Sequence, residues 1–437
     1  MQFLLKFIDF LEKKVSVRIF LLAVFLSLFL GFVVNWLSVS GKSQFTRSLG
    51  NLPSNFKRVL TGVNSDLIIK SKFKNKKKGI SVFNENLFSL HENGYLLVSR
   101  YVEDRSITEL IHIKSKKILN TWEPNINKLI DMSNQSDELT NLRIDRNQSR
   151  FMILDPALLE NGDLIFQHDS PIYKVDICSN YILMLDSYFH HSINVDENQN
   201  IWGLGRKLNR GFYDDTIKKA SKDLKKIMFE KSVFDILVEN NLDMYFASSY
   251  GFDPVHVNDV EIVKKDGKFW KKNDLFISIR NLSLIILYRP DENKVIWHKQ
   301  GPWTAQHDVD VLYDKNSISI FDNNLDITKA EVVGSNDIKI FNFENGITSS
   351  PYKEGLLREK VTTIGGGVHR ILTNGNLFIE ESNNGRILMF SKNNDLIWEY
   401  INKADDGKLR SLGWSSYYNY DEIKKLLDKK YFKKCKN

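Results

Sequence analysis

The most constraining feature of this 437-residue chain is a repeated pattern in which a polar turn leads into a short strand. In each copy, Asn, Asp or Gly residues precede apolar residues in alternation, which is typical of a turn followed by a half-buried β-strand. The copies are NGYLLVSR (93–100), NGDLIFQHD (161–169), NQNIWGLGR (198–206), KNDLFISIR (272–280), KNSISIFDN (315–323) and NGNLFIEES (374–382). The part of the chain that follows residue 80 is therefore predicted to be all-β.

The spacing of the six copies indicates how the strands are grouped. The shortest spacings are about 40 residues, the length of one four-stranded propeller blade, and the longer ones leave room for insertions. Six copies predict a six-bladed β-propeller, while a pair of β-sandwiches or a β-helix stays open as an alternative. Short helical insertions are expected, above all at 213–242, where apolar residues recur every three or four positions.

The N-terminal region carries a run of nineteen uncharged positions, Ile19–Leu37. This length is close to the ~20 residues that a helix needs to cross the hydrocarbon core, and it exceeds the apolar core of a cleavable signal peptide. Basic residues are slightly more frequent before the run than after it, which weakly favours a cytoplasmic N-terminus. Cleavage after Ser40 is the alternative. We expect a single-pass membrane protein whose remaining residues lie outside the cytoplasm, in the periplasm or the extracellular space.

These features divide the chain into four expected parts. They are a cytoplasmic tail with a transmembrane signal-anchor (1–40), a basic linker (41–80), the β-propeller domain (81–412) and a basic C-terminal helix (413–437). The net charge of +7 does not indicate a nucleic-acid partner, because six closely spaced lysines of the linker supply most of it. These lysines are Lys70, Lys72, Lys74, Lys76, Lys77 and Lys78.

Cysteine is nearly absent from the sequence. Cys178 and Cys435 are the two present, and they lie far apart along the chain. We therefore expect neither a disulfide framework nor a cysteine-based zinc site.

Four histidines precede short alternating strands at matching points of successive repeats: His191, His256, His307 and His369. Equivalent points at the start of the innermost strands surround the channel of a propeller, where an active site is commonly found. Converging imidazoles can ligate a metal, or one of them can attack a phosphoryl or sulfuryl group. Arg280 ends the strand after the His256 segment, and its cation would repel a metal but bind an oxyanion.

At these residues the chain resembles the bacterial arylsulfotransferases, the family of PAPS-independent aryl sulfate sulfotransferases. The resemblance runs from about residue 160 to 400. It is carried by FHHSINVDENQNIWG (189–203), DPVHVNDVE (253–261), GPWTAQHDVDVLYDKNSISIFDNN (301–324) and GGGVHRILTNGNLFIEESNNGRI (365–387). It implies an exported six-bladed propeller that moves a sulfuryl group from an aryl sulfate ester to a phenolic acceptor through a covalent sulfohistidine. It implies no metal and no other cofactor.

The resemblance also implies roles for single residues. His307 matches the nucleophile, and His256 and Asn258 match a pair that contacts the transferred group. Arg280 matches the sulfate-binding arginine, and His191, or His190 one position before it, matches the upstream histidine. Such a histidine can exchange a proton with the leaving or the attacking phenol. The candidates for substrate binding are Arg280, Asn258, Asp308 and His369.

Two other functions stay open. A propeller with these residues can bind a ligand or a partner without catalysis, or it can be a metal-dependent hydrolase or lyase that uses the same histidines. The sequence contains no Gly-rich phosphate loop followed by a helix, so a nucleotide sulfate donor is not expected. A homo-oligomer stays open, and most tryptophans, Trp414 among them, are expected to pack in the core.

Overall fold

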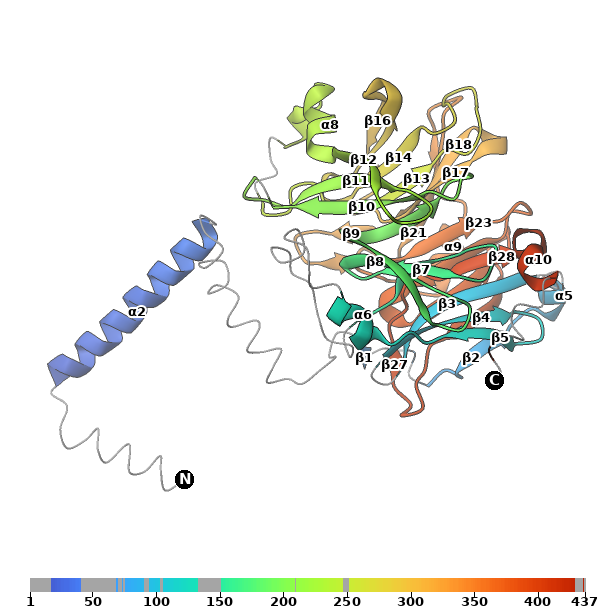
Figure 1. Cartoon of the computed structure of the whole chain (residues 1–437), viewed down its shortest axis with the longest axis horizontal. Coiled ribbons are helices and arrows are strands. Elements are labelled where there is room, and N and C mark those ends of the chain that lie inside the picture. Colours follow the sequence, from blue (N-terminus) through green and yellow to red (C-terminus); the bar gives the residue numbers. More distant parts are fainter. Residues whose placement is uncertain are drawn as a thin grey trace. The chain divides into compact units, whose positions relative to one another are not determined.

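A computed structural model describes residues 17–40, 68–69, 73, 75–89, 94–102, 105–132, 151–208, 210–246, 251–428 and 435. The chain splits into two compact units, Met1–Val63 and Asn64–Asn437. In the first unit, helix α2 spans Val17–Ser40 (Figure 1). No helix, counted over its described residues, is long and apolar enough to cross a membrane. The membrane span at Ile19–Leu37 stays a prediction.

The second unit is built mainly from antiparallel sheets (Figure 1). One of them has the order β28-β3-β4-β5 and joins the last strand of the chain to the first long ones. Its strands are β3 (Gly94–Val102), β4 (Arg105–His112), β5 (Lys117–Trp122) and β28 (Ser416–Asn419). Backbone hydrogen bonds between β28 and β3 therefore hold the two ends of the unit together.

Another sheet also joins the two ends of the unit, but here the N-terminal end supplies the single added strand. Its order is β2-β26-β25-β24-β23, so an N-terminal strand completes a C-terminal sheet. Its strands are β2 (Gly79–Val82), β23 (Val368–Ile371), β24 (Leu377–Glu381), β25 (Arg386–Phe390) and β26 (Leu396–Ile401).

Two four-stranded sheets come from the middle of the chain, with the orders β13-β14-β15-β16 and β17-β18-β21-β22. The first contains β13 (Val257–Ile262), β14 (Leu275–Ile279), β15 (Leu284–Arg289) and β16 (Lys294–Gln300). The second contains β17 (Val309–Leu312), β18 (Ser317–Asp322), β21 (Asp337–Asn342) and β22 (Thr348–Ser349). These two sheets and the two end sheets are four blades of a propeller-like, all-β fold, as the repeats predict.

The remaining large sheet has seven strands in the order β12-β11-β10-β9-β8-β7-β6. They are β6 (Leu154–Leu158), β7 (Leu164–Gln167), β8 (Ser170–Val175), β9 (Tyr181–Val195), β10 (Ile201–Lys207), β11 (Asp214–Ala220) and β12 (Ile227–Ser232). The long strand β9 pairs with β8 up to Phe189 and with β10 from His190 onward. Across all these sheets, the six repeat copies form β3, β7, β10, β14, β18 and β24.

The hydrophobic core lies between neighbouring sheets. Leu204 and Ile217 of one sheet pack with Ile277 of the next, and Ile320 and Phe341 pack in the same way against β14 and β15. Comparable clusters lie between the other neighbouring pairs of sheets, including the two that join the ends of the unit. A further cluster lies between the two halves of the seven-stranded sheet. Each blade therefore buries both faces, as expected for a propeller.

Short helices and strands occupy the connections. They are β1 (Ile68–Ile69), α5 (Glu85–Ser89), α6 (Ile126–Met132), α8 (Val233–Glu239), η2 (Asp243–Phe246), η3 (Arg280–Leu282), η4 (Pro290–Glu292), η5 (Tyr313–Lys315), β19 (Leu325–Asp326), β20 (Glu331–Val332), α9 (Lys353–Arg358), η6 (Ser382–Asn384), β27 (Leu409–Arg410) and α10 (Tyr420–Asp428).

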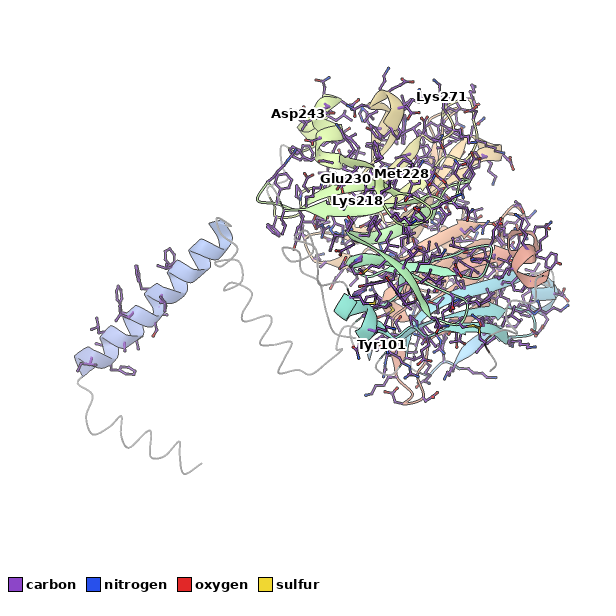
Figure 2. The ribbon with its side chains drawn as sticks, viewed as in Figure 1. Tyr101, Lys218, Met228, Glu230, Asp243 and Lys271 are labelled. Atoms are coloured by element: carbon purple, nitrogen blue, oxygen red, sulfur yellow. A yellow bond between two sulfur atoms is a disulfide. The ribbon has the colours of Figure 1, made fainter. Side chains whose placement is uncertain are left out.

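The helix expected within the segment 213–242 is confirmed as α8, and β11 and β12 take up most of the rest of that segment. Strand β11 is buried on both faces and carries a fully buried lysine, Lys218 (Figure 2), whose ammonium donates to Ser187. The predicted C-terminal helix, 413–437, is confined to α10 in the described residues, because β28 precedes it.

The lysine-rich linker makes contacts with the last sheet. Lys76 pairs with Glu399 at 2.5 Å, and Lys78 pairs with Asp405 at 2.7 Å. Lys70, Lys72 and Lys74 lie outside the described residues.

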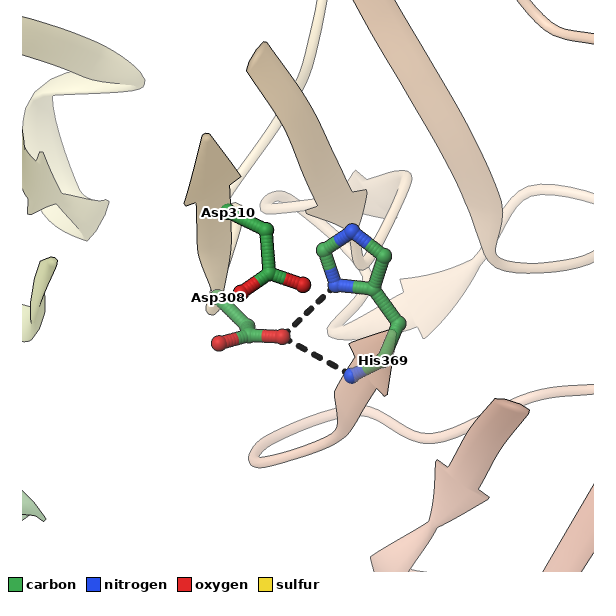
Figure 3. Close-up of side chains that lie close together, drawn as sticks. All are labelled: Asp308, Asp310 and His369. Carbon is green, nitrogen blue, oxygen red and sulfur yellow. Dashed lines mark hydrogen bonds and ion pairs between the residues drawn. The ribbon is translucent and has the colours of Figure 1, made fainter. Parts of the chain in front are cut away.

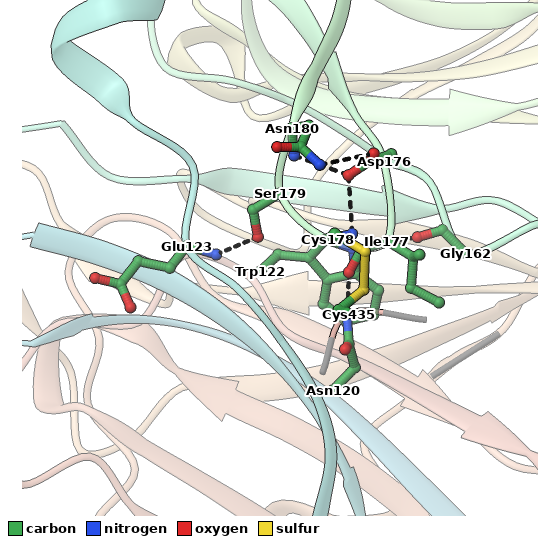
Figure 4. Close-up of a disulfide and its surroundings, with 10 residues drawn as sticks. All are labelled: Asn120, Trp122, Glu123, Gly162, Asp176, Ile177, Cys178, Ser179, Asn180 and Cys435. Atoms are coloured by element: carbon green, nitrogen blue, oxygen red, sulfur yellow. Dashed lines mark hydrogen bonds between the residues drawn. A yellow bond between two sulfur atoms is a disulfide. The ribbon is translucent and has the colours of Figure 1, made fainter. Parts of the chain in front are cut away.

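The exclusion of a disulfide framework has one correction: Cys178 and Cys435 form a disulfide across 257 positions of sequence (Figure 4). It ties the C-terminal tail to the turn that follows β8, next to Trp122 of β5. Spacing alone gave no sign of this pairing, because the two cysteines come together only after the sheets of both chain ends are assembled.

Candidate active site

The first strands of the sheets, together with the second half of β9, surround a cavity of about 650 Å³. His307, Asp308 and His369 line it, as do Asn258 and Trp414. His191 and His256 do not line the cavity itself, but they contact His307 or its neighbours at one end. The structure therefore brings the predicted residues to the starts of neighbouring inner strands.

The irregular backbone at the starts of these inner strands orients the side chains of two of the histidines. His191 and His256 have positive φ angles of 56° and 48°, a region that non-glycine residues seldom adopt. Pairing of β9 with β10 shifts register at His191, and pairing of β13 with β14 shifts just after His256. Such a bulge inserts an extra residue and turns its side chain out of the regular alternation.

Three imidazoles form what we call the histidine cluster: His191, His256 and His307. The ring centroids of His191 and His256 are 5.1 Å apart, and those of His191 and His307 are 5.9 Å apart. The indole of Trp414 closes the cluster, at 5.5 Å from His191 and 4.8 Å from His307.

His307 is buried and has a ring nitrogen, Nδ1, without a hydrogen-bond partner. Burial lowers the pKa of His307 to about 3, with Arg280 and His256 adding to the effect and Asp308 opposing it. Its main chain is fixed to β18 by a hydrogen bond from its N–H to the carbonyl of Phe321. At neutral pH this side chain is an uncharged imidazole, which is the nucleophilic form.

Arg280 and Asn258 lie beside the cluster. The backbone N–H of Arg280 donates to the carbonyl of His256, so the arginine is fixed relative to that histidine. Burial lowers the pKa of Arg280, and Asp253 acts in the opposite direction. Asn258 is buried and donates to the carbonyl of Gln306, the residue before the central histidine. A partly desolvated guanidinium next to neutral imidazoles favours an oxyanion.

His369 has a different environment from the histidine cluster. Its Nδ1 lies 2.6 Å from Asp308 Oδ2 (Figure 3). Its Nε2 lies 2.9 Å from the hydroxyl of Ser319. Asp308, Asp310 and His369 are, among the described residues, the group close enough to share a metal ion. Because both nitrogens of His369 already have protein partners, the imidazole would have to give one up to bind a metal.

Carboxylates near the cavity connect neighbouring inner strands. Asp155, Asp259 and Asp308 accept hydrogen bonds from the N–H groups of Ile193, Val309 and His369, at 2.6, 3.0 and 2.8 Å. Glu380 accepts from Trp414 and Ser415 in the same way. We call Asp155, Asp259, Asp308 and Glu380 the carboxylate layer. Burial raises the pKa of Asp155 to about 7 and also raises those of Asp259 and Glu380.

Sequence reasoning missed several residues around the cluster. Asp253 accepts from His256 Nδ1 at 2.5 Å, and Asp215 accepts from Arg206 Nε at 2.6 Å. Arg206 could have been found, because it ends its repeat copy at the position where Arg280 ends the next one. Trp414 follows the last copy and was assigned to the core, so its contact with two histidines had no signal in the repeat pattern.

The fold and the site together define a β-propeller whose inner-strand ends gather neutral imidazoles and an arginine, which is a site for an anionic group. The chain belongs to the arylsulfotransferase (ASST) family, whose model matches residues 155–403. This range contains the histidine cluster and Arg280, and it leaves out Trp414.

Other comparisons add little to this assignment. No curated protein matches the sequence significantly. The structure is similar to a protein of unknown function from Bacteroides caccae (9% identity, TM-score 0.48, covering 74% of this chain and 98% of that one). It is also similar to the hydrazine synthase of Kuenenia stuttgartiensis (12% identity, TM-score 0.40, covering 65% and 70%). No functional argument rests on these distant likenesses.

Proposed function

We propose that the protein is an aryl sulfate sulfotransferase that forms a covalent sulfohistidine at His307. The observation that carries this proposal is a buried, uncharged His307 next to His256 and a desolvated Arg280. A sulfuryl group in transfer spreads negative charge over its oxygens, so catalysis needs a nucleophile in line and fixed cations or donors around it. The family assignment supports the same chemistry.

The reaction has two balanced halves. A ring nitrogen of His307 attacks the sulfur of the aryl sulfate, an N–S bond forms, and the S–O bond to the aryl group breaks. Arg280, His256 and Asn258 hold the sulfuryl oxygens. In the second half, the oxygen of a phenolic acceptor attacks the same sulfur and the N–S bond breaks, while the acceptor's proton passes to His191. The reactants are a small aryl sulfate and a phenol.

The proposed architecture has six blades. The seven-stranded sheet counts as two four-stranded blades that share β9, because this strand changes partner between Phe189 and His190. Together with the four separate blades this makes six, in agreement with the six repeat copies.

The proposed location is outside the cytoplasm, with the domain held at the membrane by the segment 1–40. The disulfide between Cys178 and Cys435 supports an oxidising compartment, since such bonds rarely persist in the cytosol. The charge-free run at Ile19–Leu37 supports the anchor.

A turnover assay tests the activity. The full chain in detergent is mixed with 4-nitrophenyl sulfate and phenol, and release of nitrophenolate and formation of phenyl sulfate are followed. We expect both products in equal amounts, no effect of a chelator, and no turnover by His307→Asn. Release that a chelator stops would favour a metal-dependent hydrolase. Absence of turnover with several aryl sulfates would favour a binding propeller.

A further inference from the structure

The side chain of His190 lies against that of His191 and is completely buried. The two Nδ1 atoms are 2.6 Å apart, and the rings meet edge to face. The Nε2 atom of His190 lies 3.0 Å from the carbonyl oxygen of Gly205 on β10. A separation of 2.6 Å between ring nitrogens is a hydrogen bond, so one of the two Nδ1 atoms carries the hydrogen.

The Gly205 carbonyl decides which nitrogen carries that hydrogen. A carbonyl oxygen only accepts, so Nε2 of His190 must be protonated. In the neutral form of His190, Nδ1 is then bare, and His191 donates to it from its own Nδ1. Neutral His191 is left with a bare Nε2, which is the nitrogen available to a substrate proton.

Close approach of β10 makes this carbonyl contact possible. A Cβ atom at Gly205 would collide with the side chains of Lys218 and Thr216 on β11. A residue without a side chain is therefore required where the strand passes beneath His190.

A buried carboxylate lies behind the histidine pair. Asp215 Oδ1 is 3.4 Å from His190 Nε2 and accepts from Arg206 Nε at 2.6 Å, while Oδ2 accepts from the N–H of Val257 at 2.8 Å. Burial acts to raise the pKa of Asp215, but Arg206 and His190 outweigh it and the pKa is lowered. Asp215 is therefore an ionised carboxylate next to His190.

The same network returns to the histidine cluster at His256. Arg206 Nη2 lies 3.9 Å from Asp253 Oδ2, the oxygen that accepts from His256 Nδ1. The guanidinium also stacks on the ring of Tyr213, at 4.4 Å from its centroid. The chain of polar contacts therefore starts from the cluster at His191 and returns to it at His256, through the buried Asp215 and Arg206 and the partly buried Asp253.

We propose that His190 and Asp215 are positioning residues that fix the tautomer of His191 and take over its positive charge when it accepts the acceptor's proton. This inference rests on the proposed function and extends it to the second half-reaction. The phenolic proton goes to His191 Nε2, and the Nδ1 hydrogen of His191 moves along its hydrogen bond to His190 Nδ1. The positive charge then lies on His190, beside Asp215. The proton returns by the reverse path when a phenol leaves.

Kinetics with a series of acceptors test the proposal. The enzyme is first sulfated with 4-nitrophenyl sulfate, and its desulfation is then followed with phenols that are either ionised or un-ionised at the assay pH. For His190→Ala, we expect the nitrophenolate burst to be unchanged within about threefold. Transfer to un-ionised phenols should fall about 10²-fold, and transfer to ionised phenols should change little, because those need no base. His190→Asn should restore only part of the rate, since Asn Oδ1 can accept the hydrogen bond from His191 and fix its tautomer, but the amide cannot take up the proton.

A matched control replaces His298 of β16, the edge strand of its sheet, whose ring is bonded to Tyr245. His298→Ala should change neither burst nor transfer. An equal loss of burst and of transfer to every phenol in His190→Ala would overturn the proposal, because that pattern marks a merely structural role.

A second measurement does not depend on activity. The histidine ¹⁵N spectrum of the full chain, assigned with single variants, reports which nitrogen of His191 is protonated. We expect the Nδ1–H form in the wild type and in His190→Asn, and loss of this preference in His190→Ala. An Nε2–H form in the wild type would overturn the inference. If the wild type forms no sulfated enzyme while the tautomer is as expected, the proposed function fails and the positioning contact stands.

Discussion

The histidine cluster and the carboxylate layer are both buried polar groups at the inner strands, and they differ in where their hydrogen bonds go. Each carboxylate of the layer accepts hydrogen bonds from backbone N–H groups of a neighbouring segment. Asp155, for example, accepts from Ile193, and Asp259 accepts from Val309. His307, by contrast, keeps a buried ring nitrogen without a partner. Buried polar groups that are fully bonded hold a fold together, and an unpaired one needs another explanation. We therefore infer that the carboxylate layer holds the ring of blades together and that His307 serves catalysis.

Burial moves His307 of the cluster and Asp155 of the layer toward the uncharged state from opposite sides. It lowers the pKa of His307 to about 3 and raises that of Asp155 to about 7. The cluster therefore offers a neutral nucleophile, and the positive charge beside it is that of Arg280. The carboxylate layer next to the cluster carries less negative charge near an incoming sulfate.

Replacement of His307 should have the largest effect on activity. His307→Asn removes the nucleophile, and turnover of 4-nitrophenyl sulfate is expected to fall by at least ~10³-fold. Asp155→Asn, from the carboxylate layer, should retain activity within about threefold, because the amide oxygen can still accept from Ile193. A comparable loss in both variants would break the distinction between the two sets.

Replacement of Arg280 should have the next largest effect. Arg280→Met is expected to lower kcat/KM about 10²–10³-fold, because one fixed donor to the transferred group is lost. Arg280→Lys should recover only part of this, since an ammonium cannot form the planar fork. Arg289 is the matched control: it pairs with Asp274 on the outer part of the same sheet, and Arg289→Met should leave kcat/KM unchanged.

Trp414 contacts both sets, and its replacement should have a moderate effect. Its indole contacts His191 and His307, and its backbone N–H donates to Glu380. Trp414→Leu removes the aromatic contacts but keeps the backbone bond, so kcat/KM should fall about five- to tenfold. The melting temperature should change much less than it does for a core tryptophan such as Trp398→Leu.

The smallest effect on activity, but a distinct effect on stability, is expected for the carboxylate layer. The pKa of Asp155 is raised by burial, with Asp308 and Glu380 adding to it. The folded state then holds a proton that the unfolded chain releases, so stability is lost as pH rises from about 4 through 7. The loss is at most ~4 kcal/mol.

Thermal unfolding of Asp155→Asn at several pH values measures this loss. The variant should match the wild type near pH 4.5 and exceed it near pH 8. Identical pH profiles of the two proteins would show that the Asp155 carboxyl is not shifted in the folded state.

Much of the fold could be predicted from sequence because the turn-and-strand pattern is local. Five of the six copies became the second strand from an edge of their sheet, and β10 in the seven-stranded sheet is the exception. His191, His256 and His307 stand at matching points before their copies, and the fold brings them near one another. The helix expected within 213–242 is present as α8. Strand β11 of the same segment was not predicted, because it is buried on both faces and so lacks the alternation of a half-buried strand.

The parts that could not be predicted depend on contacts between sheets. Asp215 reaches His190 from another strand, so that pairing has no sequence spacing. Asp253 lies only three residues before His256, but their contact depends on an irregular loop that the repeat pattern does not describe. Cys178 and Cys435 meet only after the chain ends are joined by β28. The hydrogen bonds of the His369 ring to Asp308 and Ser319 likewise follow from the packing of β23 against β17 and β18.

Intact-protein mass spectrometry after brief exposure to 4-nitrophenyl sulfate tests the central claim most directly. We predict a mass gain of one SO₃ group that maps to the peptide containing His307, disappears on addition of phenol, and is absent from His307→Asn. An adduct that maps to another residue and persists in His307→Asn would contradict the account. So would turnover of the sulfate ester with no adduct at any time.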